Sequence, residues 1–232
     1  MASEEQIDLF NGASESEPPE GFDPAQIPTH ASVPIPVGTY GSMAEIKQHC
    51  SICVRCGLAE GRTNAVIGRG NPNASVMMVG EGPGQHEDET GLPFVGRSGQ
   101  LLDKVLASVH LTESDVFICN VVKCRPPDNR NPSNQEAEAC KGYLLEQIRM
   151  VDPKIILLTG AIAMRGLLDI RDGITKVRGR WYERDGRLYM PIFHPAYLLR
   201  NPSRDKGKPK WLMWQDIQAV RAKLDELKDA AP

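Results

Sequence analysis

The sequence predicts an α/β fold, a three-layer α/β/α sandwich built around a mostly parallel sheet. The main observation is that three short apolar runs alternate with amphipathic helices, a pattern that favours parallel strands connected by helices. The runs contain few polar residues, as expected of strands covered on both faces. A hairpin and a long C-terminal helix with a regular apolar stripe complete the pattern.

The strands and helices follow from local patterns along the chain. The three predicted strands lie at residues 75–80, 115–122 and 154–160. The helix after the first strand is expected to have Ser98 as its N-cap. The helix after the second strand opens with a capping box from Ser133 to Glu136. A hairpin is predicted around Asp185-Gly186, and its second arm is a candidate to join the sheet.

Composition divides the chain into two parts. Residues 1–40 contain seven acidic residues, no Lys or Arg and many prolines, so they are predicted to form a disordered tail. Residues 41–232 are predicted to form one domain with 27 basic and 23 acidic residues, a balance that permits nucleic-acid binding without requiring it. Because no apolar run approaches 18 residues and no signal peptide is recognisable, we expect a monomeric cytoplasmic protein without a membrane span.

Polar residues gather where the predicted strands end. Ligands of parallel sheets bind at the carboxyl ends of the strands, where Glu81, Asn120 and His194 follow apolar runs and Phe94 lies in a nearby loop. Each residue taken alone also fits a structural role. Together they suit a planar heterocycle, and they favour cleavage of the glycosidic bond of a flipped base. A nucleotide site is disfavoured because "GEGPG" matches neither the dinucleotide nor the P-loop pattern.

The cysteines indicate a metal site, because clustered cysteines in a chain of this kind bind metal more often than they form disulfides. The predicted ligands are Cys53, Cys56, Cys124 and Cys140. Cys50 is either a spare thiol or a replacement for Cys56, and Cys119 is expected to be a buried apolar residue. Four thiolates bind either zinc or an iron–sulfur cluster, and the spacing does not distinguish them. Simple burial in the core is the competing explanation.

Five segments, in this order, resemble the family-four uracil-DNA glycosylases, the iron–sulfur branch of that superfamily. They span residues 50 to about 204, which is nearly the whole predicted domain. The segments are "CVRCGLAEGRTNAVIGRG", "GEGPGQHEDETGLPFVGRSGQLLD", "NVVKCRPPDNRNP", "EACKGYL" and "VRGRWY" with "MPIFHPAYLLRNPS".

The resemblance implies a four-stranded parallel sheet and an enzyme that flips deoxyuridine out of single- or double-stranded DNA, releases uracil and leaves an abasic site. It implies a 4Fe–4S cluster on the four predicted cysteine ligands. It further implies that Phe94 stacks on uracil, that Asn120 reads its Watson–Crick edge and that His194 lies at its O2 atom.

The resemblance also raises the question of the catalytic water. Gly82, in the base-binding loop, stands where the best-known branch of the superfamily has an aspartate. Water positioning is therefore expected from Glu81 or Glu87.

Contacts with the DNA duplex are expected from the segment after His194 and from basic residues near the site. Leu198 or Leu199 is the expected wedge, with Arg200 as a phosphate or gap contact. The candidate phosphate contacts are Arg97, Ser98, Lys123, Arg125, Arg178 and Arg180.

Two other classes of protein stay open at this stage. One is a uracil-DNA binder or sensor without catalysis, in which a self-crosslinking form is disfavoured because the loop "KCRPPDNRNPSNQE" contains no histidine. The other is a zinc-bearing nucleic-acid module.

Overall fold

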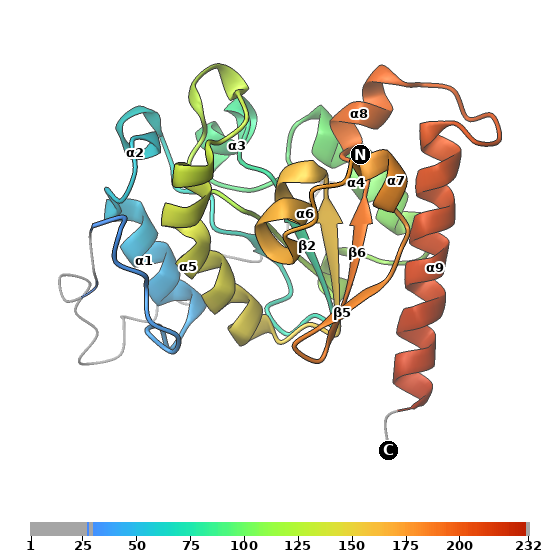
Figure 1. Ribbon diagram of the computed structural model, residues 1–232, viewed down its shortest axis with the longest axis horizontal. Helices are drawn as coiled ribbons and strands as arrows, with labels where there is room; N and C mark the ends of the chain where they lie inside the picture. The colour runs from blue at the N-terminus through green and yellow to red at the C-terminus, as the bar shows by residue number, and fades with distance from the viewer. Residues whose placement is uncertain (1–26, 28–29, 231–232) are drawn as a thin grey trace, which may run out of the picture.

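The computed structural model describes residue 27 and residues 30–230, and its described strands form one mixed sheet (Figure 1). The strand order is β1-β3-β2-β4-β6-β5. The strands are β1 (Arg69–Gly70), β2 (Val76–Gly80), β3 (Val116–Asn120), β4 (Ile155–Thr159), β5 (Tyr182–Arg184) and β6 (Arg187–Ile192). The four central strands are parallel, whereas β1 and β5 pair antiparallel at the two edges.

The described sheet therefore has six strands rather than the four expected. Both additional strands are short edge strands without an apolar run: β1 has two residues, and β5 is the largely exposed first arm of the hairpin. The hairpin predicted around Asp185-Gly186 is present, with both residues at positive φ. Its second arm, β6, pairs with β4 inside the sheet.

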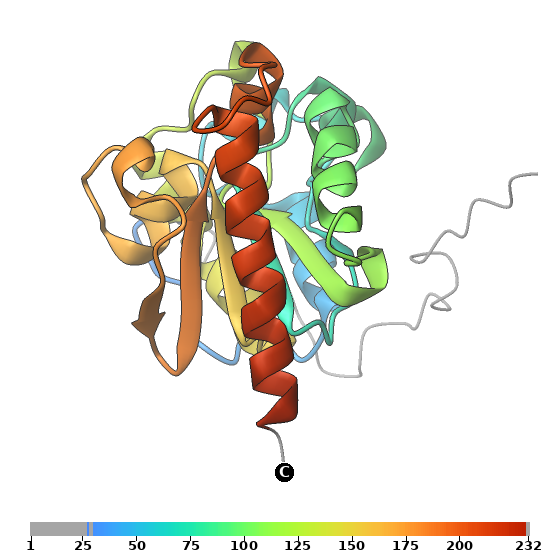
Figure 2. The ribbon, with the colours of Figure 1, turned by 90° about the vertical axis from the view of Figure 1, so that its right-hand side faces the viewer.

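Helices cover both faces of the sheet. In β2, Met77 and Val79 belong to one buried cluster while Val76 and Met78 belong to the other, as the alternation of a strand requires. The first cluster is completed by α1 (Met43–Ile52), α5 (Asn134–Val151) and α6 (Ala161–Leu168). The second is completed by α4 (Arg97–Ala107), α8 (Pro195–Arg200) and α9 (Pro209–Asp229). Figure 2 shows α9 passing in front of the sheet.

Short helical turns occupy the connections. They are α2 (Leu58–Gly61), α3 (Gln85–Thr90), α7 (Ile174–Val177), and the 3₁₀ turns η2 (Glu113–Asp115) and η3 (Pro127–Asn129). Within the part of the chain that the structure describes, no helix combines the length and apolar character needed to cross a bilayer.

The starts of two helices test the capping predictions. At α5 the capping box is present: Ser133 Oγ accepts from the Glu136 N–H at 3.2 Å, and the Glu136 carboxylate accepts from the Ser133 N–H at 2.7 Å. The prediction of Ser98 as an N-cap is wrong, because α4 begins two residues earlier, at Arg97, with Gly96 as its N-cap. The Gly96 N–H donates to Glu87, so a side chain from α3 binds this helix start.

The folded part begins before residue 41. Residues 30–40 run along α5, where the backbone N–H groups of Gly38 and Tyr40 donate to the Glu146 carboxylate at 2.9 and 3.2 Å. The predicted tail boundary at residue 40 is therefore too late, since this segment is held by backbone hydrogen bonds that no apolar periodicity reveals. Residues 1–26, the first part of the predicted tail, lie outside the described residues.

Candidate active site

The carboxyl ends of the parallel strands bring one row of residues together. Gly80 pairs with Asn120, and Thr159 pairs with Ile192. The pairing between β2 and β4 runs up to the residues directly before Gly80 and Thr159. Asn120 and Thr159 are 1% and 0% exposed, and Asn120 Oδ1 and Thr159 Oγ1 have no hydrogen-bond partner in the described structure. An unpaired buried polar atom costs about 1–3 kcal/mol, so a ligand that supplied the missing hydrogen bonds would recover that cost.

The Phe94 ring packs over Gly80. A methyl group at Gly80 would overlap both the Phe94 ring and Asn120 Oδ1, so the ring can reach the strand end only because residue 80 is glycine. Phe94 itself has φ of 54°, a left-handed conformation that bulky residues seldom adopt. Arg69 holds this loop, because its Nε donates to Pro93 O at 2.9 Å and a terminal nitrogen donates to Phe94 O at 3.4 Å.

His194 lies beside Phe94, with the two ring centroids 5.9 Å apart. It caps α8, and its Nδ1 accepts from the Ala196 N–H at 3.1 Å. In the neutral ring the proton is therefore on Nε2. Burial, with a contribution from the Arg200 charge, lowers the pKa of His194 to about 4, while Glu87 opposes this shift. The imidazole is consequently neutral at pH 7 and offers one N–H donor.

The two candidate glutamates differ in their surroundings. Glu87 accepts the N–H groups of Gly84, Val95 and Gly96 at 3.1, 3.0 and 2.9 Å, so both of its carboxylate oxygens are engaged. It ties the loop after β2 to the loop that carries Phe94. The Glu81 carboxylate has no hydrogen bond to any described residue, and burial raises its pKa. Of the two, Glu81 is available to bind water.

The loop after β2 is packed closely on its neighbours. A Cβ atom at Gly82 would lie 2.7 Å from Val122 Cγ2, so a larger residue there would need the loop to move. Farther along, the buried carboxylate of Asp88 accepts the N–H groups of Thr63 and Asn64 at 2.9 and 3.2 Å. Asp88 thus connects α3 to the segment that follows the Cys53–Cys56 pair.

Sequence reasoning missed Arg69, Asp88 and Thr159. Arg69 forms ion pairs with Asp103 at 2.6 Å and with Glu113 at 3.0 Å while it holds the Phe94 loop. The available signal was an arginine inside the short apolar segment "VIGRG". Thr159 had a weaker signal, a polar residue at the end of a buried strand.

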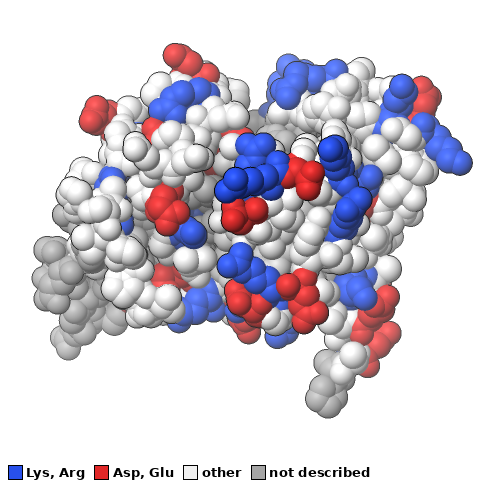
Figure 3. All heavy atoms as spheres, in the orientation of Figure 1, with Lys and Arg blue, Asp and Glu red and all other residues white. Residues whose placement is uncertain are grey.

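The predicted DNA-contacting leucines are not equivalent. Leu198 is 1% exposed and packs in the core, so its prediction as a wedge is wrong, whereas Leu199 is 36% exposed. Arg200 and Arg97 are exposed, and Ser98 is half-buried in the first turn of α4. Figure 3 shows basic and acidic side chains interspersed on the face that it views.

Two predicted phosphate contacts are also wrong. Lys123 is 1% exposed and cannot reach a phosphate outside the protein. Arg178 is mostly buried, and its Nε donates to the Asp216 carboxylate at 2.7 Å. Arg180 is exposed and Arg125 is half-buried, so these two stay as candidates.

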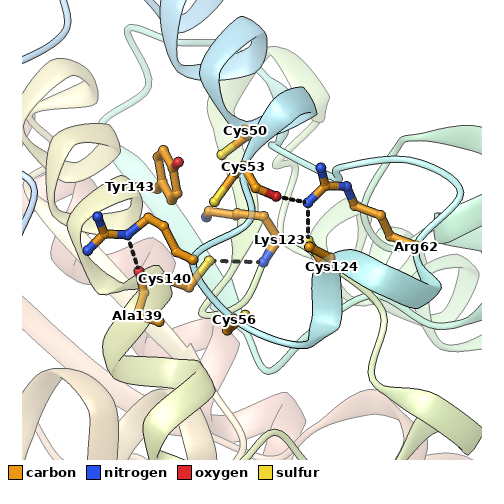
Figure 4. A pocket seen from close by; sticks show the side chains of 11 residues that line it. Cys50, Cys53, Cys56, Arg62, Lys123, Cys124, Ala139, Cys140 and Tyr143 are labelled. Atoms are coloured by element: carbon orange, nitrogen blue, oxygen red, sulfur yellow. Dashed lines mark hydrogen bonds between the residues drawn. The ribbon is translucent and has the colours of Figure 1, made fainter. Parts of the chain in front are cut away.

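Cysteine thiols from separate segments line one cavity, which also includes residues of the loop after β3 (Figure 4). They are Cys50, Cys53, Cys56, Cys124 and Cys140, so the four predicted ligands come together with one additional cysteine. Arg62 donates to Cys124 Sγ at 3.4 Å, and the backbone N–H of Lys123 donates to Cys140 Sγ at 3.3 Å. Burial raises the pKa of Cys140 to about 12, opposed by the Lys123 charge, so binding a metal would release its proton.

The cysteine thiols of the cavity are the donor type of both structural zinc sites and iron–sulfur clusters. No three cysteine, histidine or carboxylate groups of the described residues converge where one metal ion could bind. A structural zinc needs four ligands around one centre. The thiolates of a 4Fe–4S cluster each bind a different iron and need not converge, and N–H groups directed at sulfur are a usual part of such sites.

Comparison with known proteins agrees with this arrangement. The family model of the Uracil DNA glycosylase superfamily matches residues 67–218. The chain therefore belongs to the uracil-DNA glycosylase superfamily, and the resemblance found from its motifs is confirmed. Among its relatives is the Type-4 uracil-DNA glycosylase of Thermotoga maritima, 42% identical over 184 residues, which cover 78% of this chain and 93% of that protein.

Two archaeal relatives carry the same description. The Type-4 uracil-DNA glycosylase of Sulfurisphaera tokodaii is 41% identical over 78% of this chain and 84% of its own length. That of Pyrobaculum aerophilum is 42% identical over 65% of this chain and 81% of its own length. The similarity thus covers most of the folded part.

Proposed function

We propose that this chain is a type-4 uracil-DNA glycosylase, which extrudes deoxyuridine from DNA and hydrolyses the bond between the base and C1′ of the sugar. The products are uracil and an abasic site, the first step of base excision repair. The observation that carries the proposal is the meeting of Phe94 and Asn120 over Gly80, with His194 beside Phe94 and a buried Asn120 oxygen that has no partner in the described structure. The family and its Type-4 relatives support the same activity.

Base recognition rests on Asn120. Its amide oxygen accepts from the N3–H of uracil and its NH₂ group donates to O4. Cytosine presents the opposite pattern at both positions, and each mismatched buried group costs about 1–3 kcal/mol. Stacking on the Phe94 ring fixes the plane of the base but does not distinguish among pyrimidines.

Bond cleavage rests on His194 and Glu81. As the bond to C1′ breaks, negative charge develops on uracil, and the Nε2–H of the neutral imidazole stabilises it at O2. Glu81, whose carboxylate is not otherwise engaged, orients the water that attacks C1′. Glu87 positions the Phe94 loop through its three backbone hydrogen bonds.

Cys53, Cys56, Cys124 and Cys140 hold a 4Fe–4S cluster in this proposal. When bound, the cluster supplies a covalent cross-link between the segment after α1, the loop after β3 and helix α5, since its four ligands come from these elements. Leu199 and Arg200, exposed on α8 after the catalytic histidine, contact the DNA from which the base is extruded.

A strand-cleavage assay tests the activity. The purified protein is incubated with an oligonucleotide that contains one uracil, and abasic sites are revealed with alkali on a denaturing gel. We expect cleavage at the uracil, reduced about 10²–10³-fold in His194→Ala, as for loss of one donor to a developing anion. Asn120→Ala should lose uracil cleavage as well, whereas Asn73→Ala, an exposed loop residue, should be unchanged.

Other outcomes would contradict the proposal. A retained gel shift with uracil-DNA but no base release would identify a binding protein or sensor. Absence of both would show that the substrate is wrong.

A further inference from the structure

Lys123 is a buried cation in an unusual position. It lies at the start of the loop after β3, between the candidate base-reading residue and the cysteine cavity whose wall it helps to form (Figure 4). Its ammonium donates to the backbone oxygen of Asn120 at 2.6 Å and to the side-chain oxygen of Gln147. Its backbone N–H donates to Cys140 Sγ. One residue thus contacts both sites.

The charge of this lysine lacks a carboxylate counter-ion. Among the ion pairs of the described residues, none joins Lys123 to an aspartate or glutamate. Its two ammonium hydrogen-bond acceptors are neutral oxygens, and the side chain is 1% exposed. Taking an ammonium group out of water costs several kcal/mol unless an opposite charge is close. Five cysteines, whose thiols can carry negative charge as thiolates, line the same cavity as Lys123.

We propose that Lys123 is the counter-ion of the metal-binding thiolates, held beside their cavity by its hydrogen bonds to Asn120 O and Gln147 Oε1. This inference rests on the proposed function, because it requires the cluster. Four cysteinates bring negative charge into a cavity with little water, and the ammonium balances part of it. Lys123 is therefore a positioning residue: it touches Asn120 and the cysteine cavity but not the substrate.

The alternative is that Lys123 stabilises the structure only through its hydrogen bonds and that its charge has no role. Gln147 provides the matched control, because it contacts the same ammonium and also donates to Ile67 O at 2.9 Å. Gln147→Leu removes neutral hydrogen bonds and leaves the charge, whereas Lys123→Met and Lys123→Gln remove the charge. Lys123→Gln keeps a donor toward Asn120, so it remains informative should Lys123→Met fail to fold.

The experiment measures retention of the cluster in the full-length protein. Iron and sulfide per chain are determined, and the visible absorbance is followed after addition of an iron chelator. Loss of an outer-shell partner of a metal site typically costs 10–100-fold in affinity. We therefore expect both Lys123 variants to lose absorbance about 10- to 100-fold faster than wild type, and Gln147→Leu to stay near the wild-type rate.

Thermal unfolding of the loaded and metal-free forms gives a second readout. Lys123→Met should lower the Tm of the loaded protein and should not lower that of the metal-free protein, where the ammonium has lost its counter-ion. Equal chelator rates in wild type and both Lys123 variants would overturn the counter-ion inference and leave the function standing. A wild-type protein without iron and sulfide would instead overturn the cluster, whatever the variants do.

Discussion

At the scale of single residues, the candidate active site depends on the absence of a side chain at Gly80. Its missing side chain lets the Phe94 ring and the Asn120 amide share the space at the end of β2. The neighbouring strand end carries Thr159, whose hydroxyl is also buried without a partner in the described structure. The candidate site therefore consists of an aromatic ring beside buried hydrogen-bonding atoms without partners, which is the arrangement expected for a planar polar ligand.

Gly80→Ala should disrupt the packing of Phe94 and Asn120 at the end of β2. The added methyl group overlaps Asn120 Oδ1 and the Phe94 ring, so we expect a loss of about 1–3 kcal/mol in the free energy of unfolding and strongly reduced uracil release. Urea denaturation and the cleavage assay measure the two effects. Gly61→Ala is the control, because a Cβ there meets nothing within 4 Å. Wild-type activity in Gly80→Ala would contradict the proposed site.

His194 should make stability depend on pH. Its pKa is about 4 in the folded protein, whereas an unperturbed histidine has a pKa of 6.5. Below pH 6.5 the unfolded chain binds a proton that the folded protein excludes. Stability should therefore fall as the pH drops from 6.5 to 4, by up to about 3 kcal/mol, and this contribution should level off below pH 4.

The measurement compares urea denaturation of wild type and His194→Gln at pH 7 and pH 4.5. Wild type should lose more stability than the variant over this interval. An NMR titration of the His194 ring with a midpoint near 6.5 would contradict the lowered pKa of His194 and the pH dependence expected from it.

At the scale of elements, the loops of the site are fixed by charged side chains from elsewhere in the chain. Glu87 of α3 binds three backbone N–H groups, and Arg69 of β1 binds two backbone oxygens around Phe94. Asp103 of α4 and Glu113 of η2 hold the arginine in turn. A residue of a two-residue edge strand thereby holds the backbone of the loop that carries Phe94.

Arg69→Met should loosen that ring. We expect kcat/KM for uracil release to fall about 10- to 100-fold, because small displacements of a reacting group cost rates of this order. Arg187→Met is the matched control, since it removes an ion pair with Asp152 at 2.6 Å at the opposite ends of the strands. If both variants lose only stability, Arg69 has no role in positioning Phe94.

At the scale of the whole molecule, the cysteine cavity joins segments that are distant in sequence. Cys53 and Cys56 follow α1, Cys124 follows β3 and Cys140 lies in α5. The same region receives residues 30–40, which are bound to α5 through Glu146. A cluster at this position would stabilise the N-terminal part of the fold against the sheet, close to Asn120 at the end of β3.

Cys124→Ser should therefore act on the whole structure. We expect loss of iron, a lower Tm and loss of activity, since metal binding to such a site contributes directly to folding. Cys119→Ala is the control, because Cys119 is buried in β3 and does not line the cavity. It should keep its iron. Metal analysis and thermal unfolding separate the two variants, and full iron content in Cys124→Ser would exclude Cys124 as a ligand.

The sequence by itself determined the features that depend on local patterns. The apolar runs of β2, β3 and β4 predicted three central strands, because a strand buried on both faces needs such a run wherever it occurs. The Asp185-Gly186 turn and the Ser133–Glu136 capping box were predictable for the same reason, since each is made by residues close in sequence.

Only the tertiary structure decided what depends on distant neighbours. Leu198 and Leu199 are adjacent and chemically identical, yet packing against the second core cluster buries only the first. Glu81 lies in the loop after β2 and Glu87 in the adjoining helix α3, and it is the approach of the Phe94 loop that engages Glu87 and leaves Glu81 available. Lys123 looks like a surface cation in the sequence, but the fold encloses it between Asn120 and the cysteines, because burial is set by all the elements that pack around a residue.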